Sequence, residues 1–332
     1  MKVWNDGDAD LVYLENKLAA ILGYGNQGRA QALNLRDSGI SVVVGNRDDE
    51  YREQAIRDGF EVLSIAESAS RGDFVFVLTT DESQPLIWEH EIAPGLEPDN
   101  TLVWASGYNV AYELVVPPTE VDVVMVAPRM TGNMVRELYV RGKGAMAQVG
   151  VSHNASGDAQ ERMLAVAKAI GCTRGGVYPS TFREEAELDL FAEQVVWAGL
   201  TAWFVECFQI GVESGFSPEL MVLELYASGE ASEILGLMAR NGFFRQMTHH
   251  STTSQYGTLS RGPDLITDEM KRRARRNLIE DIQGGKFAAE WAREQAGNSG
   301  TLASLREAAL EHPMSKAEKS IIELVQGAHN LE

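Results

Sequence analysis

Short apolar runs alternate with amphipathic stretches through the first half of this chain, a pattern that indicates strands separated by helices. Four of the runs are mostly apolar, as strands buried on both faces of a parallel sheet would be, and they occupy residues 18–22, 41–45, 74–78 and 101–104. Beyond residue 180 no convincing strand follows, and long helical patterns dominate. The pattern therefore predicts an α/β protein, with a parallel-sheet domain over 1–180 and an all-helical domain over 181–332.

The first apolar run breaks into the sequence Gly-x-Gly-x-x-Gly and then into a helical pattern. Gly23 and Gly25 would let the backbone turn sharply and lie against a pyrophosphate, and Gly28 would let the helix pack close to its strand. A purely structural turn can have the same short motif, but the strands on either side favour a Rossmann-type, dinucleotide-binding domain. The candidate cofactor contacts are Gly23, Tyr24, Gly25, Asn26, Gln27, Gly28, Thr79, Ser106 and Gly132.

The residues after the second apolar run indicate which nicotinamide cofactor is bound, because the adenosine ribose lies over that end of the strand. An arginine there could hold a 2′-phosphate, but the three consecutive carboxylates that follow it would repel a dianion and accept hydrogen bonds from a free ribose hydroxyl. The sequence therefore favours NADH over NADPH. The alternative is a solvated loop that caps the next helix. The residues concerned are Arg47, Asp48, Asp49 and Glu50.

The helical half begins with a pattern that defines one helix. Thr181-x-x-Glu184 has the spacing of a capping box. Apolar residues at spacings of three and four predict the buried stripe of this helix, at Leu188, Phe191 and Val195.

Asp189 and Glu193 lie one helical turn apart and could together bind Mg²⁺, which takes oxygen ligands. The alternative is a solvated acidic face, and a further carboxylate must converge on the pair to decide for a metal. Glu219 and Glu224, on a later helical segment, are available for this.

Charge and cysteine content exclude some classes of partner. The net charge of −19 would repel nucleic acid and anionic membranes. The two cysteines, Cys172 and Cys207, have no metal-ligand spacing, which favours free thiols in a reduced cytoplasmic protein. No signal peptide is evident at residues 1–6.

The longest apolar run, residues 195–205, is interpreted as too short to span a bilayer and as a helix buried on all sides. Aromatic residues in and after it are predicted to be core, at Trp197, Trp203, Phe204 and Phe208.

Ordered matches along nearly the whole chain give a family resemblance. They include Gly23-Tyr24-Gly25-Asn26-Gln27-Gly28, Val121-Asp122-Val123-Val124-Met125-Val126-Ala127-Pro128, Glu184-Glu185-Ala186-Glu187-Leu188-Asp189-Leu190-Phe191-Ala192-Glu193-Gln194, and Ser251-Thr252-Thr253-Ser254-Gln255-Tyr256-Gly257. In these segments the chain resembles the short-form ketol-acid reductoisomerases.

The resemblance implies a knotted helical domain and a homodimer, or a higher homo-oligomer, whose helical domains complete each other's active sites. It implies that Asp189, Glu193 and Glu224 hold Mg²⁺ and that Ser251 touches the substrate. The implied reaction is an Mg²⁺-dependent alkyl migration in a 2-hydroxy-2-acyl acid, followed by hydride transfer to the resulting 2-keto acid, within branched-chain amino-acid synthesis.

Several positions depart from the family pattern. The second glutamate expected one turn after Glu224 is Ser228, although Glu230 lies nearby. The lysine expected after Ala127-Pro128 is Arg129, which is included among the candidate catalytic residues because it could supply positive charge. Histidines expected at three further positions are replaced by Arg29, Ser106 and Asn133.

These departures weaken the case for alkyl migration more than the case for reduction, because migration requires carboxylate and metal chemistry that Ser228 cannot perform. The sequence therefore favours an NADH-preferring, Mg²⁺-assisted reductase of a small 2-keto or related acid, with the isomerisation weakened or lost. The alternatives are an authentic ketol-acid reductoisomerase and a non-catalytic, nucleotide-binding paralogue.

Overall fold

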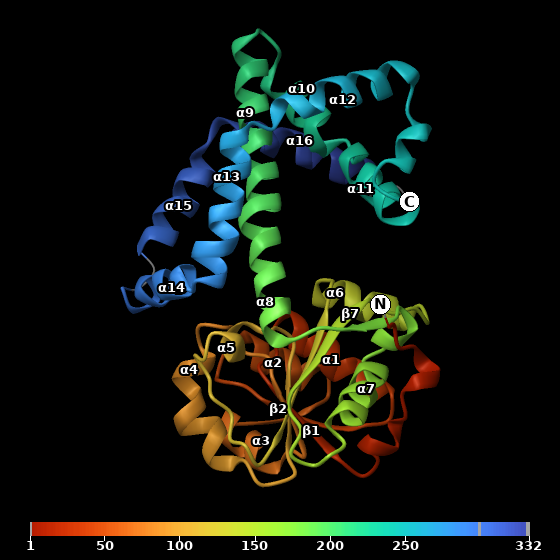
Figure 1. The fold of residues 1–332 in the computed structure, drawn as a ribbon, viewed down its shortest axis with the longest axis vertical. Coiled ribbons are helices and arrows are strands. Elements are labelled where there is room, and N and C mark those ends of the chain that lie inside the picture. Colours follow the sequence, from red (N-terminus) through yellow and green to blue (C-terminus); the bar gives the residue numbers. More distant parts are fainter. Residues whose placement is uncertain (1, 298–299, 330–332) are drawn as a thin grey trace. The chain divides into compact units, whose positions relative to one another are not determined.

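The computed structural model describes residues 2–297 and 300–329, and it divides the chain into two compact units, Met1–Asp189 and Leu190–Glu332. The first unit is an α/β domain and the second is helical (Figure 1). The division falls after Asp189, whereas the sequence predicted it after residue 180. The later boundary reflects the start of helix α8, Phe182–Phe191, whose residues Phe182 and Ala186 are buried in the core of the first unit.

A single eight-stranded sheet, in the order β3-β2-β1-β4-β5-β6-β7-β8, forms the centre of the first unit. The four predicted strands are present as β1, β2, β4 and β5. The strands are β1 Leu18–Leu22, β2 Ser41–Gly45, β3 Glu61–Leu63, β4 Phe74–Val77, β5 Thr101–Trp104, β6 Asp122–Pro128, β7 Ala147–His153 and β8 Val177–Pro179.

The expectation of a parallel sheet is wrong for one pair of strands, since β7 runs antiparallel to β6. The reason lies in the connection between them. Helix α6, Gly132–Val140, and the turn at Gly142 return the chain to the end of β6, so that Ala147 pairs with Pro128 and the chain runs back along the strand. The other strand pairs are parallel.

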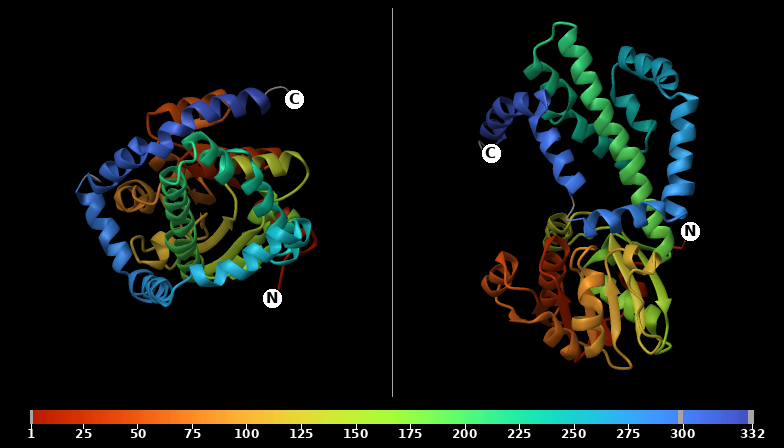
Figure 2. Two further views of the ribbon diagram at one scale, coloured as in Figure 1. Left: turned by 90° about the horizontal axis from the view of Figure 1, so that it is seen from above. Right: turned by 90° about the vertical axis from the view of Figure 1, so that its left-hand side faces the viewer.

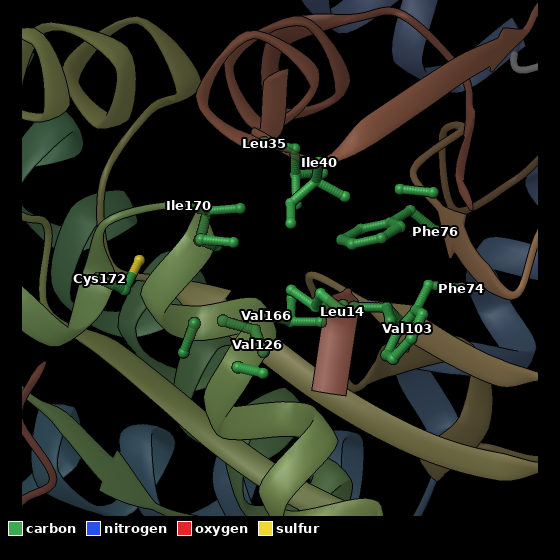
Figure 3. Packing of buried hydrophobic residues seen from close by; sticks show 14 of the residues in the cluster. Leu14, Leu35, Ile40, Phe74, Phe76, Val103, Val126, Val166, Ile170 and Cys172 are labelled. Atoms are coloured by element: carbon green, nitrogen blue, oxygen red, sulfur yellow. The ribbon is translucent and has the colours of Figure 1, made fainter. Parts of the chain in front are cut away.

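Helices cover both faces of this sheet, because alternate residues of each buried strand point to opposite faces. Ile21 of β1 packs on one face with residues of α1 and α7, and Figure 3 shows several members of this cluster, including Phe76 and Val166. Leu22 packs on the other face with Trp88. The helices of the first unit are α1 Asn26–Asp37, α2 Glu50–Arg57, α3 Ile65–Arg71, α4 Gln84–Ile87, α5 Tyr108–Ala111, α6, α7 Ala159–Ala169 and the first turns of α8.

The described residues of the second unit are helical, as predicted (Figure 2). Phe208, Val222 and Met314 belong to its buried core. Its helices are α9 Ala198–Glu213, α10 Pro218–Val222, α11 Glu230–Asn241, α12 Thr252–Leu265, α13 Asp268–Arg276, α14 Lys286–Ala296, α15 Gly300–Glu311 and α16 Pro313–His329, with π-helical turns at Ala192–Trp197, Leu223–Ala227 and Asn277–Gln283. The knotted path of this half stays a prediction.

Two predictions about the apolar run at 195–205 are wrong. The run is part of a longer helix, Phe182–Glu213, which by length and composition alone could cross a membrane, although a core helix of a protein outside a membrane would meet the same criteria. Nor is it buried on all sides, because Trp197 and Trp203 are about half exposed, at 52% and 45%. Of the four aromatic residues, Phe208 is buried and Phe204 packs against the core.

The predicted stripe of α8 is also wrong, since Leu188 is exposed. The buried side chains at the start of this helix are those of Phe182, Glu185 and Ala186, because the helix places this face against the end of the sheet. The capping interaction is present on one side, where the Glu184 N–H donates to Thr181 Oγ1 at 3.0 Å.

Candidate functional site

The glycine motif forms a tight turn between β1 and α1. Gly23 has a φ of 95°, and a Cβ at this position would lie 2.7 Å from the Thr79 nitrogen. A Cβ at Gly28 would lie 1.9 Å from the Gly23 carbonyl oxygen. At Gly25, the N-cap of α1, a Cβ would meet no atom of the described residues within 4 Å. The turn is therefore closed on the protein side and open at the first amides of α1, where an anion binds favourably.

A second helix N-terminus meets the first at this point. The Gly132 N–H donates to Asn26 Oδ1, and Gln27 Nε2 donates to the Met130 carbonyl oxygen at 2.9 Å. A Cβ at Gly132 would lie 1.9 Å from the Asn26 carbonyl oxygen. The starts of α1 and α6 are thus locked together, and glycine is required at the contact.

A cavity of about 460 Å³ opens beside these helix starts. Its lining includes Gly25 and Asn26 from α1, Tyr51 from α2, and Asn133 and Arg136 from α6. The cavity therefore joins the glycine turn to the helix that follows β2, which is where a dinucleotide in a Rossmann domain extends from its pyrophosphate to its adenosine.

The Tyr24 side chain belongs to the support of the turn. It is buried, its hydroxyl donates to Asp58 Oδ2 at 2.9 Å, and its ring packs edge-on against Phe60. Its own N–H donates to Asn46 Oδ1 at 2.9 Å. These contacts tie the glycine turn to Asn46, just after β2, and to Asp58, the C-cap of α2.

The acidic segment after β2 caps a helix, in agreement with the alternative interpretation of the sequence. Asp49 is the N-cap of α2, and its Oδ1 accepts from the N–H groups of Tyr51 at 3.0 Å and Arg52 at 3.2 Å. Its Oδ2 accepts from Arg47 Nε at 2.7 Å. The only cation among the predicted cofactor contacts here is therefore already paired with a carboxylate.

Polar groups without a protein partner lie at the ends of β4 and β5. Thr79 Oγ1 and the Tyr108 hydroxyl are buried and have no hydrogen-bond partner in the described part of the chain. Ser106 Oγ accepts from the Tyr108 N–H at 3.3 Å, and Gln84 Nε2 donates to the Thr79 carbonyl oxygen at 2.9 Å. Because buried polar atoms are nearly always satisfied, a polar ligand such as a nicotinamide cofactor fits this edge of the sheet.

A guanidinium group joins two carboxylates at the end of β6. Arg129 Nη1 donates to Glu185 Oε1 at 2.7 Å, and Nη2 donates to Asp189 Oδ1. The Asp189 side chain is 39% exposed, whereas that of Glu185 is 1% exposed. Burial acts to lower the pKa of Arg129, but the charges of Asp189 and Glu185 outweigh it and raise the pKa, so that the guanidinium stays charged.

Glu185 is the residue of this cluster that sequence reasoning did not select. Its Oε2 accepts from the Gly107 N–H at 2.6 Å, so that one carboxylate connects the loop after β5, the end of β6 and helix α8. A Cβ at Gly107 would lie 2.0 Å from the Phe182 carbonyl oxygen, which shows how closely α8 approaches that loop. In the sequence Glu185 is one of several acidic residues in a row, and no spacing distinguishes the buried one.

Burial raises the pKa of Glu185 to about 7, against the hydrogen bond from Gly107 and the charge of Arg129. The stability contributed by a raised pKa is complete below the ordinary value of 4.5 and is lost as the pH rises through about 7. We expect the free energy of unfolding to fall as the pH rises over this range. Glu185→Gln should remove the part of this decrease that is due to Glu185. Urea unfolding at about pH 5 and about pH 8 measures it. Glu61→Gln, at an exposed ion pair, is the control, and an unchanged pH dependence in Glu185→Gln would contradict the assignment.

The remaining predicted residues lie on the helical unit. Glu193 and Glu224 each belong to a π-helical turn, and Ser251 is the N-cap of α12, where its Oγ accepts from the Ser254 N–H at 3.2 Å. Within residues 2–297 and 300–329, no group of three or more His, Cys, Asp or Glu side chains is arranged to hold a metal ion. The ligand set stays a prediction, and its carboxylates are the oxygen donors that Mg²⁺ prefers.

The chain changes direction where the second glutamate of the family was expected. Ser228 ends the π-helical turn, Gly229 has a φ of 87°, and α11 begins at Glu230. The Glu230 N–H donates to Ser228 Oγ at 3.5 Å, and the Glu230 side chain is exposed. A carboxylate is thus present two residues after the serine, on the first turn of a new helix.

Two family models match this chain, and together they cover most of it. The model described as acetohydroxy acid isomeroreductase, NADPH-binding domain, matches residues 13–176, and the model described as ketol-acid reductoisomerase, C-terminal domain, matches residues 182–326.

Individual relatives match over nearly their whole length. The chain is 44% identical to the putative ketol-acid reductoisomerase 3 of Saccharolobus solfataricus, over 96% of this chain and 97% of the relative. It is 41% identical to the ketol-acid reductoisomerase (NADP(+)) of Pyrobaculum calidifontis, over 98% and 99%. Among solved structures, an NADH-preferring ketol-acid reductoisomerase from an uncultured archean is similar with a TM-score of 0.93 and 37% identity, over 98% of this chain and 99% of that one.

Proposed function

This chain belongs to the ketol-acid reductoisomerase family, and from that premise we propose that it is a cytoplasmic enzyme of branched-chain amino-acid synthesis. It converts a 2-hydroxy-2-acyl acid into a dihydroxy acid by alkyl migration followed by reduction. Two observations carry the proposal. Each half of the chain matches a family model, and the whole chain is 44% and 41% identical to two named reductoisomerases over nearly their full length. The glycine turn and the cluster of Arg129, Glu185 and Asp189 supply the local chemistry.

The nucleotide is held by the glycine turn and by the starts of α1 and α6. Gly25 leaves room for the pyrophosphate at the amides of α1, and the contact between Asn26 and Gly132 fixes the second helix start beside it. Thr79 and Tyr108 offer unpartnered hydroxyls at the sheet edge where the nicotinamide would lie. The bound cofactor supplies the hydride.

NADH is proposed as the preferred cofactor. The guanidinium of Arg47 is already paired with Asp49, so it is less available to a 2′-phosphate, and the neighbouring carboxylates disfavour that group. The similar structure from the uncultured archean is named as NADH-preferring, whereas the Pyrobaculum relative is named for NADP(+). The names of these two proteins indicate different cofactors. The ion pair between Arg47 and Asp49 is the argument that comes from this chain itself.

Mg²⁺ is proposed to bind Asp189 and Glu193, with Glu224 as a further ligand. The ion supplies Lewis-acid polarisation of the oxygens next to the migrating group. Arg129 pairs with Asp189, and Glu185 anchors Arg129. Arg129 adds positive charge near the substrate but does not donate a proton at neutral pH.

A homodimer, or a higher homo-oligomer, is proposed to complete this ligand set. The support is that apolar side chains of the long helix are half exposed, among them Trp197, Trp203 and Ile210. A monomer in sedimentation velocity at micromolar concentration would contradict the proposal.

A second candidate function is reduction of a 2-keto acid with the isomerisation weakened or lost. Ser228 favours it, because a hydroxyl replaces a carboxylate that would serve in proton transfer. Arg129 also favours it, because it reduces the negative charge at Asp189.

The test is incubation of the purified protein with 2-acetolactate, Mg²⁺ and either NADH or NADPH, with the dihydroxy acid detected by mass spectrometry. Turnover with a higher kcat/KM for NADH than for NADPH is expected. Reduction of a preformed 2-keto acid without turnover of 2-acetolactate would instead establish the second candidate. No reaction with either compound would overturn both and leave a nucleotide-binding paralogue.

A further inference from the structure

We infer that Arg129 is a positioning residue that competes with the metal ion for Asp189, so that a divalent cation binds only by displacing one arm of the guanidinium. The inference rests on the proposed magnesium site. It adds that the metal affinity of this chain is set by an internal ion pair.

The two arms of the guanidinium are held unequally. Nη1 donates at 2.7 Å to Glu185, which is buried and also accepts from the Gly107 N–H at 2.6 Å. Nη2 donates to Asp189, whose carboxylate is 39% exposed. The hydrogen bond to Glu185 lies out of contact with water, which strengthens it, whereas water can solvate the Asp189 carboxylate and replace the guanidinium there. The arm on Asp189 is therefore the one that a cation displaces.

Only arginine can form this bridge. Its planar fork presents two nitrogens in fixed directions, and here they reach two carboxylates four residues apart on α8. A lysine, which the family resemblance led us to expect at this position, has one ammonium group on a flexible chain and would remain with the buried Glu185. The oxygens of Asp189 would then be free for a metal. The exchange of lysine for arginine thus predicts weaker metal binding without any change in the ligands themselves.

The test is isothermal titration of MgCl₂ into the full-length, nucleotide-free protein. Arg129→Gln and Arg129→Lys should both bind Mg²⁺ more tightly than the parent, by about fivefold, the factor expected for release of a partly exposed ion pair. Arg129→Lys keeps the positive charge, so it separates competition for Asp189 from a general loss of charge. It also keeps a cation beside Glu185, so that the test can still be made if Arg129→Gln fails to fold. Arg183→Gln is the matched control, because Arg183 pairs with Glu187 on the same helix, and it should leave the affinity unchanged.

Three results would overturn the inference. The first is an unchanged or weaker affinity in Arg129→Lys, because the effect of Arg129→Gln would then come from charge alone. The second is an increase in the Mg²⁺ affinity of Arg183→Gln equal to that of the Arg129 variants. The third is no Mg²⁺ binding in the parent or in either Arg129 variant, which would also overturn the proposed metal site, whereas the first two results leave that site intact.

Discussion

Replacing Gly28 by alanine is expected to abolish NADH binding and to lower the free energy of unfolding by about 3 kcal/mol or more. A Cβ at this position would lie 1.9 Å from the Gly23 carbonyl oxygen, and backbone at a tight turn cannot move aside as a flexible side chain could. The turn would have to open, and the first amides of α1 would lose their direction toward the pyrophosphate. Calorimetric titration with NADH and urea unfolding measure the two effects.

Gly25→Ala separates ligand binding from folding at the same turn. Gly25 has φ −77° and ψ −152°, which alanine also adopts, and its Cβ would meet no described atom within 4 Å. We expect the stability to change by less than about 0.5 kcal/mol and the NADH affinity to fall at least about tenfold as the methyl group displaces the pyrophosphate. Gly257→Ala, in an open position on α12, is the control. Unchanged affinity in Gly25→Ala would contradict the proposed position of the pyrophosphate.

The part of the fold that could be predicted is the part that burial determines. β1, β2, β4 and β5 are mostly apolar because they lie inside a sheet covered on both faces, and the predicted runs match the observed strands to within a residue. Strands β3 and β8 escaped prediction because each has three residues, too few to establish a period. Strands β6 and β7, of seven residues each, were not predicted as strands either, although β6 is buried throughout. The antiparallel direction of β7 depends on where α6 returns the chain, and no local sequence pattern predicts the direction of a strand.

The site was less predictable, because side chains of one type have different roles there. Asp49 and Asp48 are adjacent acids, yet Asp49 caps α2 and pairs with Arg47. Glu185 resembles its acidic neighbours in the sequence but is buried against the end of the sheet, where it connects three elements. The error at Trp197 has a different cause, since apolar side chains also lie on protein surfaces and an apolar run alone does not establish burial.

The second large effect is expected at Glu230, which decides whether alkyl migration is retained. Migration needs a carboxylate that moves a proton or supports the metal, and a serine hydroxyl at 228 does not provide one. The helical run ends at Ser228, the left-handed residue Gly229 turns the chain, and Glu230 begins α11 with its side chain exposed. Ser228 therefore lies one turn after Glu224 at the end of this helical run, and beyond the break Glu230 is the next carboxylate that the segment offers.

Glu230→Gln is therefore expected to lower the turnover of 2-acetolactate by about a hundredfold or more, the range typical of losing a proton-transferring group. Reduction of a preformed 2-keto acid should continue at close to the parent rate, because hydride transfer needs a positioned nicotinamide and a polarised ketone but no carboxylate at this position. Parallel rate measurements with the two compounds, under saturating Mg²⁺ and NADH, separate the two steps.

Ser228→Ala is the matched control, since it removes a side-chain oxygen two residues away and leaves the turn at Gly229 unchanged. It should have the parent rate with both compounds. If Ser228→Ala and Glu230→Gln both left the turnover of 2-acetolactate intact, neither side chain would serve the migration, and Glu224 would have to act without a second glutamate from this segment. An equal loss of both rates in Glu230→Gln would assign Glu230 to binding of the metal or the substrate, because both reactions require that binding.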